Sequence, residues 1–332
     1  MCLDKAPELQ YHESMKAYLI WNPAAGQRDV RHGLEEACKT LEAADWTVRL
    51  RETVCPGDGT DLAREAVANG ADVAIAAGGD GTVSEVVNGL VGSQVALGVL
   101  PVGTGNVWAK EMGYPIWVPP NRHPLRMAAQ ALLDASVHRV DVGCANGRHF
   151  LLWAGAGFDA LVAHEVETSM IEMRRRVGNV TYALTALNLA MSFVGNRCTV
   201  VVDGKVRRQR VVQMIISNAH LYGGGLVRLA PTACLDDGYL NVLLFRGQGT
   251  AATLHHVFSL LAQSHLRDPR VDYYRAQQVE IYSEKPMPVQ LDGDAYGQTP
   301  LRVHVVPQAL NVLVPPTASN TLFARPAMEY VQ

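Results

Sequence analysis

The chain contains little net charge and few aromatic residues. Of its 332 residues, 18% are charged and 7% are aromatic, and the formal net charge is −3. Proteins that bind nucleic acid usually carry a strong local or overall positive charge, so this balance argues against a nucleic-acid partner. The remaining composition, 48% hydrophobic, is typical of a folded protein with a sizeable core.

Clustered cysteines are absent as well. The six cysteines are scattered and none belongs to a CxxC pair; they are Cys2, Cys38, Cys55, Cys144, Cys198 and Cys234. A zinc site needs clustered ligands, and a disulfide framework is typical of short secreted chains. We therefore expect reduced thiols and a cytoplasmic protein.

Long apolar segments are also missing. The opening sequence MCLDKAPELQYHESMK has no apolar signal-peptide core. No apolar run reaches the length of about 18–20 residues that a transmembrane helix needs. Any contact with lipid is thus expected to be a peripheral association with the membrane surface.

Strand-like and helix-like patterns alternate through residues 1–140. Short strand-like segments occur at 16–21, 46–52, 72–77 and 96–100, and helical spacing occurs at 30–44, 61–69 and 82–90. Such alternation predicts a parallel sheet with helices on both faces. We assign residues 1–140 to an α/β domain.

The second half has the pattern of hairpins. Asn146-Gly147, Asp203-Gly204 and Asp292-Gly293 each follow or separate apolar segments, and such dipeptides favour tight hairpin turns. Helical spacing occurs at 161–193 and 250–264. Residues 141–306 are therefore predicted to form a mostly antiparallel β-sandwich domain with inserted helices. Residues 307–332 are expected to pack back on the first domain, with a loosely held polar tail from Thr317.

A glycine-rich turn follows the buried segment DVAIAA. Gly78-Gly79-Asp80-Gly81-Thr82 lies between this strand and a helix. Glycines at such a turn let backbone amides approach phosphate oxygens, and the helix N-terminus stabilises their charge. Asp80 could hold magnesium or accept a proton. The alternative is a tight turn that binds nothing.

Two further strands end in turns of the same character. Pro101 to Asn106 (PVGTGN) follows ALGVL, and Asn22 to Gly26 (NPAAG) follows the first strand. The carboxyl ends of parallel strands meet at one edge of a sheet, where open α/β folds bind ligands. Three such turns in one domain favour a nucleotide site.

These motifs resemble the diacylglycerol kinase catalytic family, which includes bacterial lipid kinases, diacylglycerol kinases and sphingosine kinases. The resemblance is carried, in order along the chain, by NPAAG (22–26), AAGGDGTVSEVVNGL (76–90), LPVGTGN (100–106), GAGFDA (155–160), LAPTACLDDGYLNV (229–242) and LDGD (291–294). It implies an NAD kinase/diacylglycerol kinase-like fold, in which the second domain receives the lipid. It also implies transfer of the γ-phosphoryl group of ATP, with Mg²⁺, to a hydroxyl of diacylglycerol or a related lipid such as a sphingoid base.

The resemblance also assigns roles to individual positions. Residues that match ATP-binding positions are Asn22, Pro23, Ala24, Ala25, Gly26, Thr53, Gly78, Gly79, Asp80, Gly81, Thr82, Val83, Ser84 and Thr104. Cys234, Asp237 and Tyr239 match a magnesium site, the first and last through backbone carbonyls. Asp159 falls where sphingosine kinases contact the lipid head group. From spacing alone, 236–238 would be an ordinary acidic turn.

The proton acceptor is less clearly assigned. Asp294 stands where bacterial members carry a glutamate that takes the proton of the lipid hydroxyl, and the shorter side chain leaves Asp80 as the alternative base. Val107 replaces the usual aspartate after GTGN, and Ser84 replaces a frequent asparagine. Asp141 could also join the polar network.

Two groups of residues could meet a membrane. Aromatic and aliphatic residues lie just after the second glycine turn (Trp108, Tyr114, Ile116, Trp117, Val118), and arginines lie at 174–176 and at 207, 208 and 210. Interfacial aromatics and basic residues would suit an enzyme that acts on bilayer lipid. The alternative is a packed loop and solvated arginines. The sequence does not decide between a monomer and a dimer.

Two other functions remain open. An NAD kinase-like enzyme with a soluble substrate would share GGDGT and the two-domain plan, although LPVGTGN and LDGD favour the lipid branch. The second is a non-catalytic regulator that binds lipid or nucleotide. Val107 and the shorter acid at position 294 suggest this alternative. No GxxxxGK[ST] motif is present, which excludes a P-loop kinase.

Overall fold

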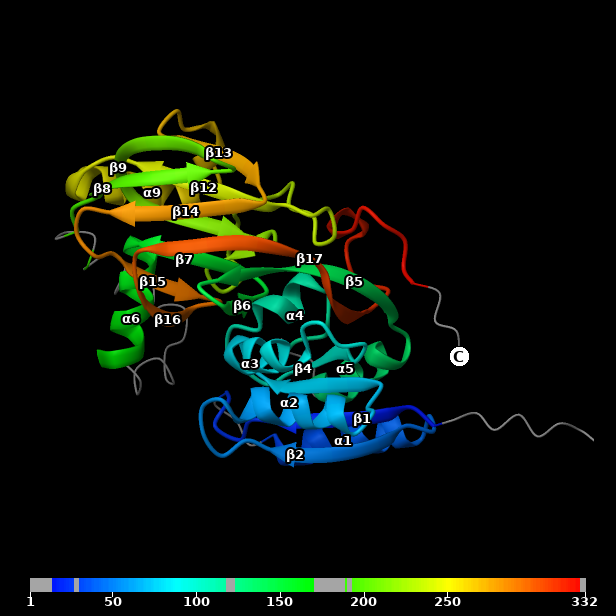
Figure 1. The fold of residues 1–332 in the computed structure, drawn as a ribbon. Coiled ribbons are helices and arrows are strands. Elements are labelled where there is room, and N and C mark those ends of the chain that lie inside the picture. The colour runs from blue at the N-terminus through cyan, green and yellow to red at the C-terminus, as the bar shows by residue number, and fades with distance from the viewer. Residues whose placement is uncertain (1–13, 27–29, 118–122, 170–188, 190–192, 329–332) are drawn as a thin grey trace, which may run out of the picture.

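The structure, a computed structural model, describes residues 14–26, 30–117, 123–169, 189 and 193–328. Figure 1 shows two lobes. The lower lobe holds the first strands and helices of the chain, and the upper lobe is dominated by strands from its second half.

The first four strands form a parallel sheet, as predicted. They are β1 (Lys16–Trp21), β2 (Thr47–Glu52), β3 (Val73–Gly78) and β4 (Ala96–Pro101), in the order β2-β1-β3-β4. Every residue of β3 and β4 is buried, as expected for central strands covered on both faces.

The helices of this domain cover the sheet in pairs. They are α1 (Arg31–Glu42), α2 (Asp58–Ala68), α3 (Asp80–Leu90), the short α4 (Val107–Glu111) and α5 (Pro124–Leu133). The chain runs from β1 outward to β2 and then back across β1 to β3, so right-handed crossovers place α1 and α2 on opposite faces. Helix α1 packs against α5, and α2 packs against α3.

Strand β17 (Leu301–Val314) connects the two domains. Its Asn311 and Val312 pair in parallel with β4, while much of its length pairs antiparallel with β5 (Ser136–Ala145) and β14 (Gln278–Ser283). One hydrogen-bonded sheet therefore passes through both domains. The segment after β17 lies beside β5 (Figure 1).

The second domain is mostly antiparallel, as predicted. Its further strands are β6 (Arg148–Phe150), β7 (Trp153–Gly157), β8 (Asn196–Val202), β9 (Lys205–Ser217), β10 (Leu221–Tyr222), β11 (Val227–Arg228), β12 (Leu240–Arg246), β13 (Val271–Ala276), β15 (Pro288–Leu291) and β16 (Asp294–Gln298). Helices α6 (Phe158–Ser169) and α9 (Gly249–Leu261) are inserted between strands, and two short 3-10 turns, η1 (His265–Arg267) and η2 (Asn320–Leu322), complete the elements. All three expected hairpin dipeptides have positive φ at both residues.

The expectation of a loose tail from Thr317 is wrong. The Thr317 hydroxyl donates to the carbonyl of Gly113 at 2.7 Å, and the buried Asp236 carboxylate accepts the N–H groups of Ala324 and Arg325 at 2.7 and 2.9 Å. The side chain of Leu322 is 1% exposed. The polar composition of the segment did not indicate these hydrogen bonds, because the acceptor residues lie far away in the sequence.

Candidate active site

The three glycine-rich loops meet at the carboxyl edge of the parallel sheet. The closest approach is between two backbones: a Cβ atom on Gly103 would lie 2.4 Å from the Cα of Gly79. Only glycine at position 103 permits this contact, because the atom it would strike is main chain. The loops after β3 and β4 are thus in direct contact.

The first loop joins the other two through its ends. Gly26 has φ of +77°, and a Cβ atom there would lie 2.3 Å from the carbonyl oxygen of Val102. The Asn22 amide donates to the Thr82 hydroxyl at 3.2 Å and accepts from the backbone N–H of Ala24 at 2.9 Å. The convergence expected from the sequence therefore occurs.

Asp80 is the first residue of α3 and lies at the centre of this edge. Its carboxylate accepts the backbone N–H of Trp108 at 3.1 Å, which ties α3 to the start of α4. Burial raises the pKa of Asp80, and the nearby Asp294 charge raises it too. The N–H groups of Trp108 and Val107 and the charge of Lys110 lower it. The raising effects are larger, so the pKa of Asp80 lies above its usual value. Val107, which replaces the expected acid, thus contributes a backbone donor.

Asp294 lies beside Asp80 although 214 positions separate them in the chain. It opens β16, and a Cβ atom on Gly81 would lie 3.4 Å from its Oδ2 atom. The two carboxylates, one from each domain, therefore face the same region next to the glycine-rich loops. This juxtaposition is the central feature of the site.

The turn that carries Asp294 is held by two buried side chains. The Asp292 carboxylate accepts the backbone N–H groups of Leu151, Leu152 and Trp153 at 2.8–3.2 Å. The Gln290 amide oxygen accepts the N–H of Gly293 at 2.8 Å. Because both anchors are buried, the position of Asp294 is fixed from both sides of the hairpin turn.

Asp159 is connected to that same turn. It lies near the N-terminus of α6, is 6% exposed, and accepts a hydrogen bond of 2.8 Å from the Gln290 amide nitrogen. A Cβ atom on Gly155 would lie 2.6 Å from this nitrogen, so the glycine leaves room for the pair. Gln290 thus bridges the expected head-group residue and the loop of the expected base.

The other residues that are expected to bind the nucleotide differ in solvent exposure. Thr104 is exposed in the third loop, whereas Thr53, at the end of β2, is 8% exposed and its N–H donates to the carbonyl of Trp21. The side chains of Val83 and Ser84 are 4% and 1% exposed, so they face the protein interior. Of these four side chains, only that of Thr104 is exposed to a ligand.

The residues expected to bind magnesium lie in a turn that already has partners. One Asp237 oxygen pairs with the Arg275 guanidinium at 2.6 Å and the other accepts the N–H of Tyr239 at 3.0 Å. The Cys234 thiol donates to Asp236, and burial raises its pKa to about 11. The Arg275 guanidinium already compensates the charge of the Asp237 carboxylate, and the magnesium assignment stays a prediction.

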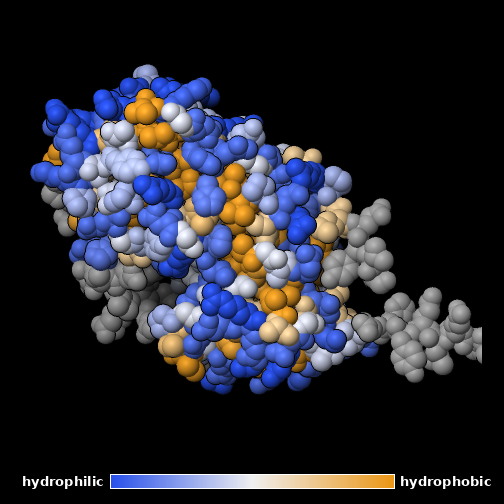
Figure 2. Space-filling view, in the orientation of Figure 1, coloured by the Kyte–Doolittle hydropathy of each residue, from blue (hydrophilic) through white to orange (hydrophobic). Residues whose placement is uncertain are grey.

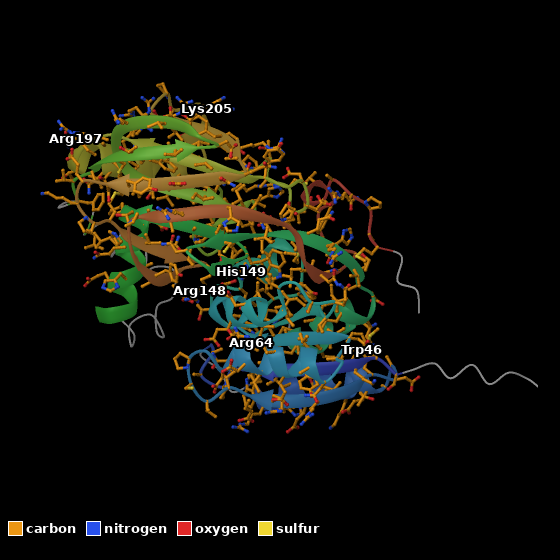
Figure 3. The ribbon with its side chains drawn as sticks, in the orientation of Figure 1. Trp46, Arg64, Arg148, His149, Arg197 and Lys205 are labelled. Carbon is orange, nitrogen blue, oxygen red and sulfur yellow. The ribbon has the colours of Figure 1, made fainter. Side chains whose placement is uncertain are left out.

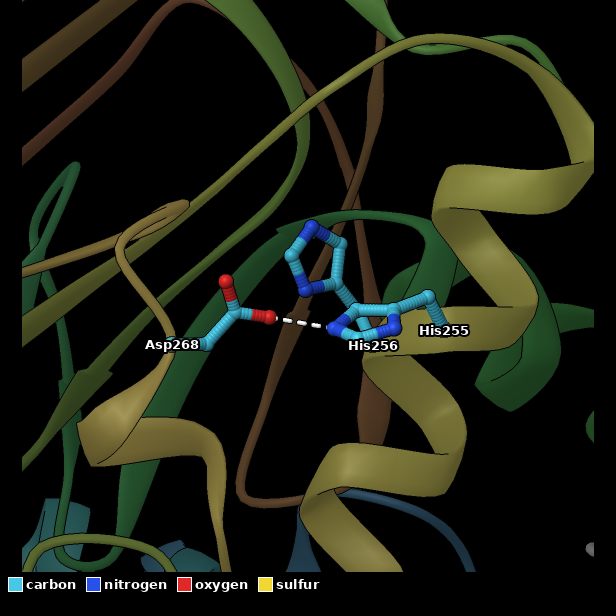
Figure 4. A group of neighbouring side chains, drawn as sticks. All are labelled: His255, His256 and Asp268. Carbon is cyan, nitrogen blue, oxygen red and sulfur yellow. Dashed lines mark hydrogen bonds and ion pairs between the residues drawn. The ribbon is translucent and has the colours of Figure 1, made fainter.

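A second group of possible ligands lies on the outer part of the β-rich domain. His255, His256 and Asp268 place one nitrogen or oxygen each within 4.8 Å of one another (Figure 4). His255 pairs with Asp268, whose carboxylate also accepts two bonds from the Arg270 side chain, at 3.1 and 3.3 Å. Since the carboxylate charge is already compensated, the group acts as an ion-pair link between α9 and the turn after it.

Lys110 is a site residue that the sequence motifs did not indicate. Its ammonium group donates to the carbonyl of Gly224 at 2.7 Å. Burial lowers the pKa of Lys110 and the Asp80 charge raises it, with a net lowering. Gln290 and Asp292 were also missed, because only their partners, distant in the sequence, show what they hold.

The expected membrane patch after the second glycine loop is wrong in part. Trp108 and Tyr114 are 1% and 4% exposed, and the Tyr114 hydroxyl donates to the carbonyl of Leu313. Trp117 is 46% exposed, as an interfacial residue would be. Val118 and the arginines at 174–176 lie outside the described residues.

Figure 3 shows the side chains of both lobes, with Lys205 at the outer end of the β-rich domain and Arg148 and His149 near the junction.

The fold and the site together define a class: two-domain proteins in which glycine-rich loops of a parallel sheet meet a carboxylate from a β-rich domain. Comparison with family models narrows this class. Residues 16–145 match the diacylglycerol kinase catalytic domain, and residues 153–314 match the YegS C-terminal NAD kinase beta sandwich-like domain. The chain thus contains a diacylglycerol kinase catalytic domain followed by a YegS C-terminal domain, and these domains support a kinase activity.

Relatives and solved structures agree with this placement. The chain is 28% identical over 309 residues to the diacylglycerol kinase of Bacillus subtilis (strain 168), covering 92% of this chain and 99% of the relative. It is 27% identical over 303 residues to the diacylglycerol kinase of Staphylococcus aureus (strain MRSA252), covering 90% and 92%. A crystal structure of a diacylglycerol kinase from Bacillus anthracis str. Sterne superposes with a TM-score of 0.68 at 25% identity, covering 92% and 98%.

Within the described residues, none of the helices has the length and apolar character needed to span a membrane.

Proposed function

We propose that the protein is an ATP-dependent lipid kinase that phosphorylates a hydroxyl of diacylglycerol or of a related lipid such as a sphingoid base. The observation that supports this most is the pair of carboxylates, Asp80 and Asp294, beside the glycine-rich loops at the edge of the parallel sheet. The names of the relatives point to the same substrate class.

The chemistry follows from the arrangement. Phosphoryl transfer depends mainly on positioning and on neutralising charge. Backbone amides of the loops at 22–26, 78–82 and 101–106 would hold the nucleotide phosphates, and Mg²⁺ would enter with ATP as part of the substrate. The lipid oxygen forms the new bond to the γ-phosphorus, the bond to the bridging oxygen breaks, and ADP leaves.

Asp294 is the better proton acceptor of the two carboxylates. Asp80 already accepts backbone N–H groups of α4, so its lone pairs are partly occupied. Asp294 comes from the β-rich domain and is tied through Gln290 to Asp159, where the lipid head group would lie. The hydroxyl proton therefore passes to Asp294, and Asp80 organises the loop edge.

A parallel assay tests the proposal. The purified protein is given radiolabelled ATP and Mg²⁺ with diacylglycerol, sphingosine or NAD. We expect a labelled lipid product, and a loss of about 100-fold or more in kcat for Asp294→Asn and Asp80→Ala. Asp61→Ala is the control, because Asp61 is an exposed residue of α2.

Other results would assign another function. Phosphorylation of NAD alone would refute the lipid kinase in favour of a soluble-substrate kinase. Tight lipid binding without turnover in the wild-type protein would favour a regulator.

A further inference from the structure

Helix α9 exposes a row of apolar side chains and contains no charged residue. Its sequence is GTAATLHHVFSLL, in which Phe258 and Leu261 are 60% and 57% exposed. Leu266, in the following turn η1, is 43% exposed. Surface helices normally carry charged residues on their outer side, and exposed apolar groups that cluster indicate an interaction site.

The inner side of α9 is fixed by packing, so this row cannot turn inward. His256 packs its ring against Phe245 of β12 with centroids 5.3 Å apart, and its Nε2 atom donates to the carbonyl of Arg246 at 2.8 Å. Another side of the helix, with Ala252, Leu254 and Val257, joins a small apolar cluster with Phe158 of α6. Figure 1 shows α9 in the upper lobe.

The surroundings of the row are positively charged. Four arginines lie near the two ends of α9: Arg210, Arg246, Arg267 and Arg270. Two aspartates, Asp268 and Asp272, oppose them and leave two positive charges in excess. The Asp268 side chain is 7% exposed while that of Arg270 is 47% exposed, so the cations dominate what a partner meets.

Hydrophobic residues are exposed elsewhere too, but without this arrangement. Figure 2 shows apolar residues in a broken diagonal band on one face of the molecule, with hydrophilic residues on both sides of it. The α9 row differs because the helix, the following turn and three of the four arginines (Arg246, Arg267 and Arg270) belong to one continuous segment, 246–270, while Arg210 lies on β9. Apolar side chains flanked by cations match an anionic bilayer, whose acyl region accepts the former and whose headgroups accept the latter.

We propose that α9 and η1 form a membrane-docking surface for anionic lipid bilayers. Phe258, Leu261 and Leu266 enter the interface, and the arginines contact headgroups. The cluster that α9 shares with Phe158 packs this helix against α6, the helix that carries Asp159. The role in substrate delivery rests on the proposed function, but docking itself is a binding event that needs no turnover.

Co-sedimentation with vesicles tests the surface directly. Wild-type protein should bind phosphatidylcholine vesicles that contain phosphatidylglycerol, and bind less to phosphatidylcholine alone. The vesicle partition coefficient of the double variant Phe258→Ser/Leu261→Ser should be about ten-fold lower or more than that of the wild type. The reason is that the variant lacks two apolar side chains that transfer from water into the bilayer interface. Met127→Ser, on the 50% exposed position of α5, is the matched control and should bind as wild type.

A second measurement does not depend on the serine variants. Leu261→Trp should show a blue-shifted fluorescence difference spectrum on addition of anionic vesicles, relative to Met127→Trp. Equal vesicle binding by wild type and the serine double variant, or no shift for Leu261→Trp, would overturn the proposal. Dimers in solution that the serine variant dissolves would also overturn it, in favour of a second copy as the partner.

Activity then separates the two proposals. If both hold, the serine double variant loses activity on diacylglycerol in vesicles and keeps it on a short-chain diacylglycerol dispersed in solution. Vesicle binding through α9 in a protein without kinase activity would support docking and refute the enzyme.

Discussion

Lys110 and Asp80 influence each other's ionisation at the edge where the loops meet. The Lys110 charge lowers the pKa of Asp80, which burial and Asp294 raise. Asp80 acts as an anion, so activity falls as the pH falls through its pKa. Lys110→Met should therefore raise that pKa and move the acid limb of kcat/KM to higher pH, while Lys110→Arg should leave it near the wild-type position. Equal pH profiles for all three proteins would contradict this coupling.

Gln290 is a positioning residue between Asp159 and the turn of Asp294. Gln290→Ala removes both hydrogen bonds, at 2.8 Å each, and should raise the KM for lipid and lower kcat with little change in the KM for ATP. Gln290→Glu places a carboxylate against Asp159 and should act more strongly. Steady-state kinetics with both substrates varied would show whether the KM for lipid changes while the KM for ATP does not. Gln278→Ala is the control, because Gln278 is exposed. An equal rise in both KM values would point to a general loss of structure.

At the scale of elements, the contact between the loops after β3 and β4 depends on a single missing methyl group. Gly103→Ala would place its Cβ atom 2.4 Å from the Cα of Gly79, so the loops must separate. We expect a loss of about 2 kcal/mol or more in the free energy of unfolding and weaker nucleotide binding. Gly79→Ala is the matched control for stability, because its Cβ atom would meet Gly103 at an ordinary 3.4 Å. Chemical denaturation of the three proteins gives the comparison, and equal stability of the two variants would refute the argument.

The elements themselves followed from local pattern. Local patterns predicted the four parallel strands within a residue or two. β3 and β4, which are buried on both faces, are apolar throughout. The dipeptides at 146–147, 203–204 and 292–293 predicted hairpins because their residues tolerate positive φ. Trp108 and Tyr114 were misjudged, since an aromatic residue looks the same in sequence whether it lies in a core or at an interface.

At the scale of the whole molecule, Asp141 joins segments that are far apart in the chain. Its buried carboxylate accepts the N–H of Gly238 at 2.6 Å and that of Gln308 at 2.7 Å. Asp141→Ala leaves both donors without this acceptor and should cost about 2–4 kcal/mol of stability. Because one sheet runs through both domains, unfolding should remain a single transition. Calorimetry beside Asp61→Ala, an exposed control, tests this; two separate transitions would show independent domains.

By itself, the sequence determined the fold class of each domain, the three glycine-rich loops and the acidic residues that are candidates for catalysis. These features are local: apolar periodicity, turn dipeptides and glycines at strand ends act through neighbouring residues. The tertiary structure alone decided that Asp294 lies beside Asp80, that Gln290 connects it to Asp159, and that Asp236 holds the tail. Such contacts depend on how β17 carries the chain from one domain into the other, and no short segment contains that information.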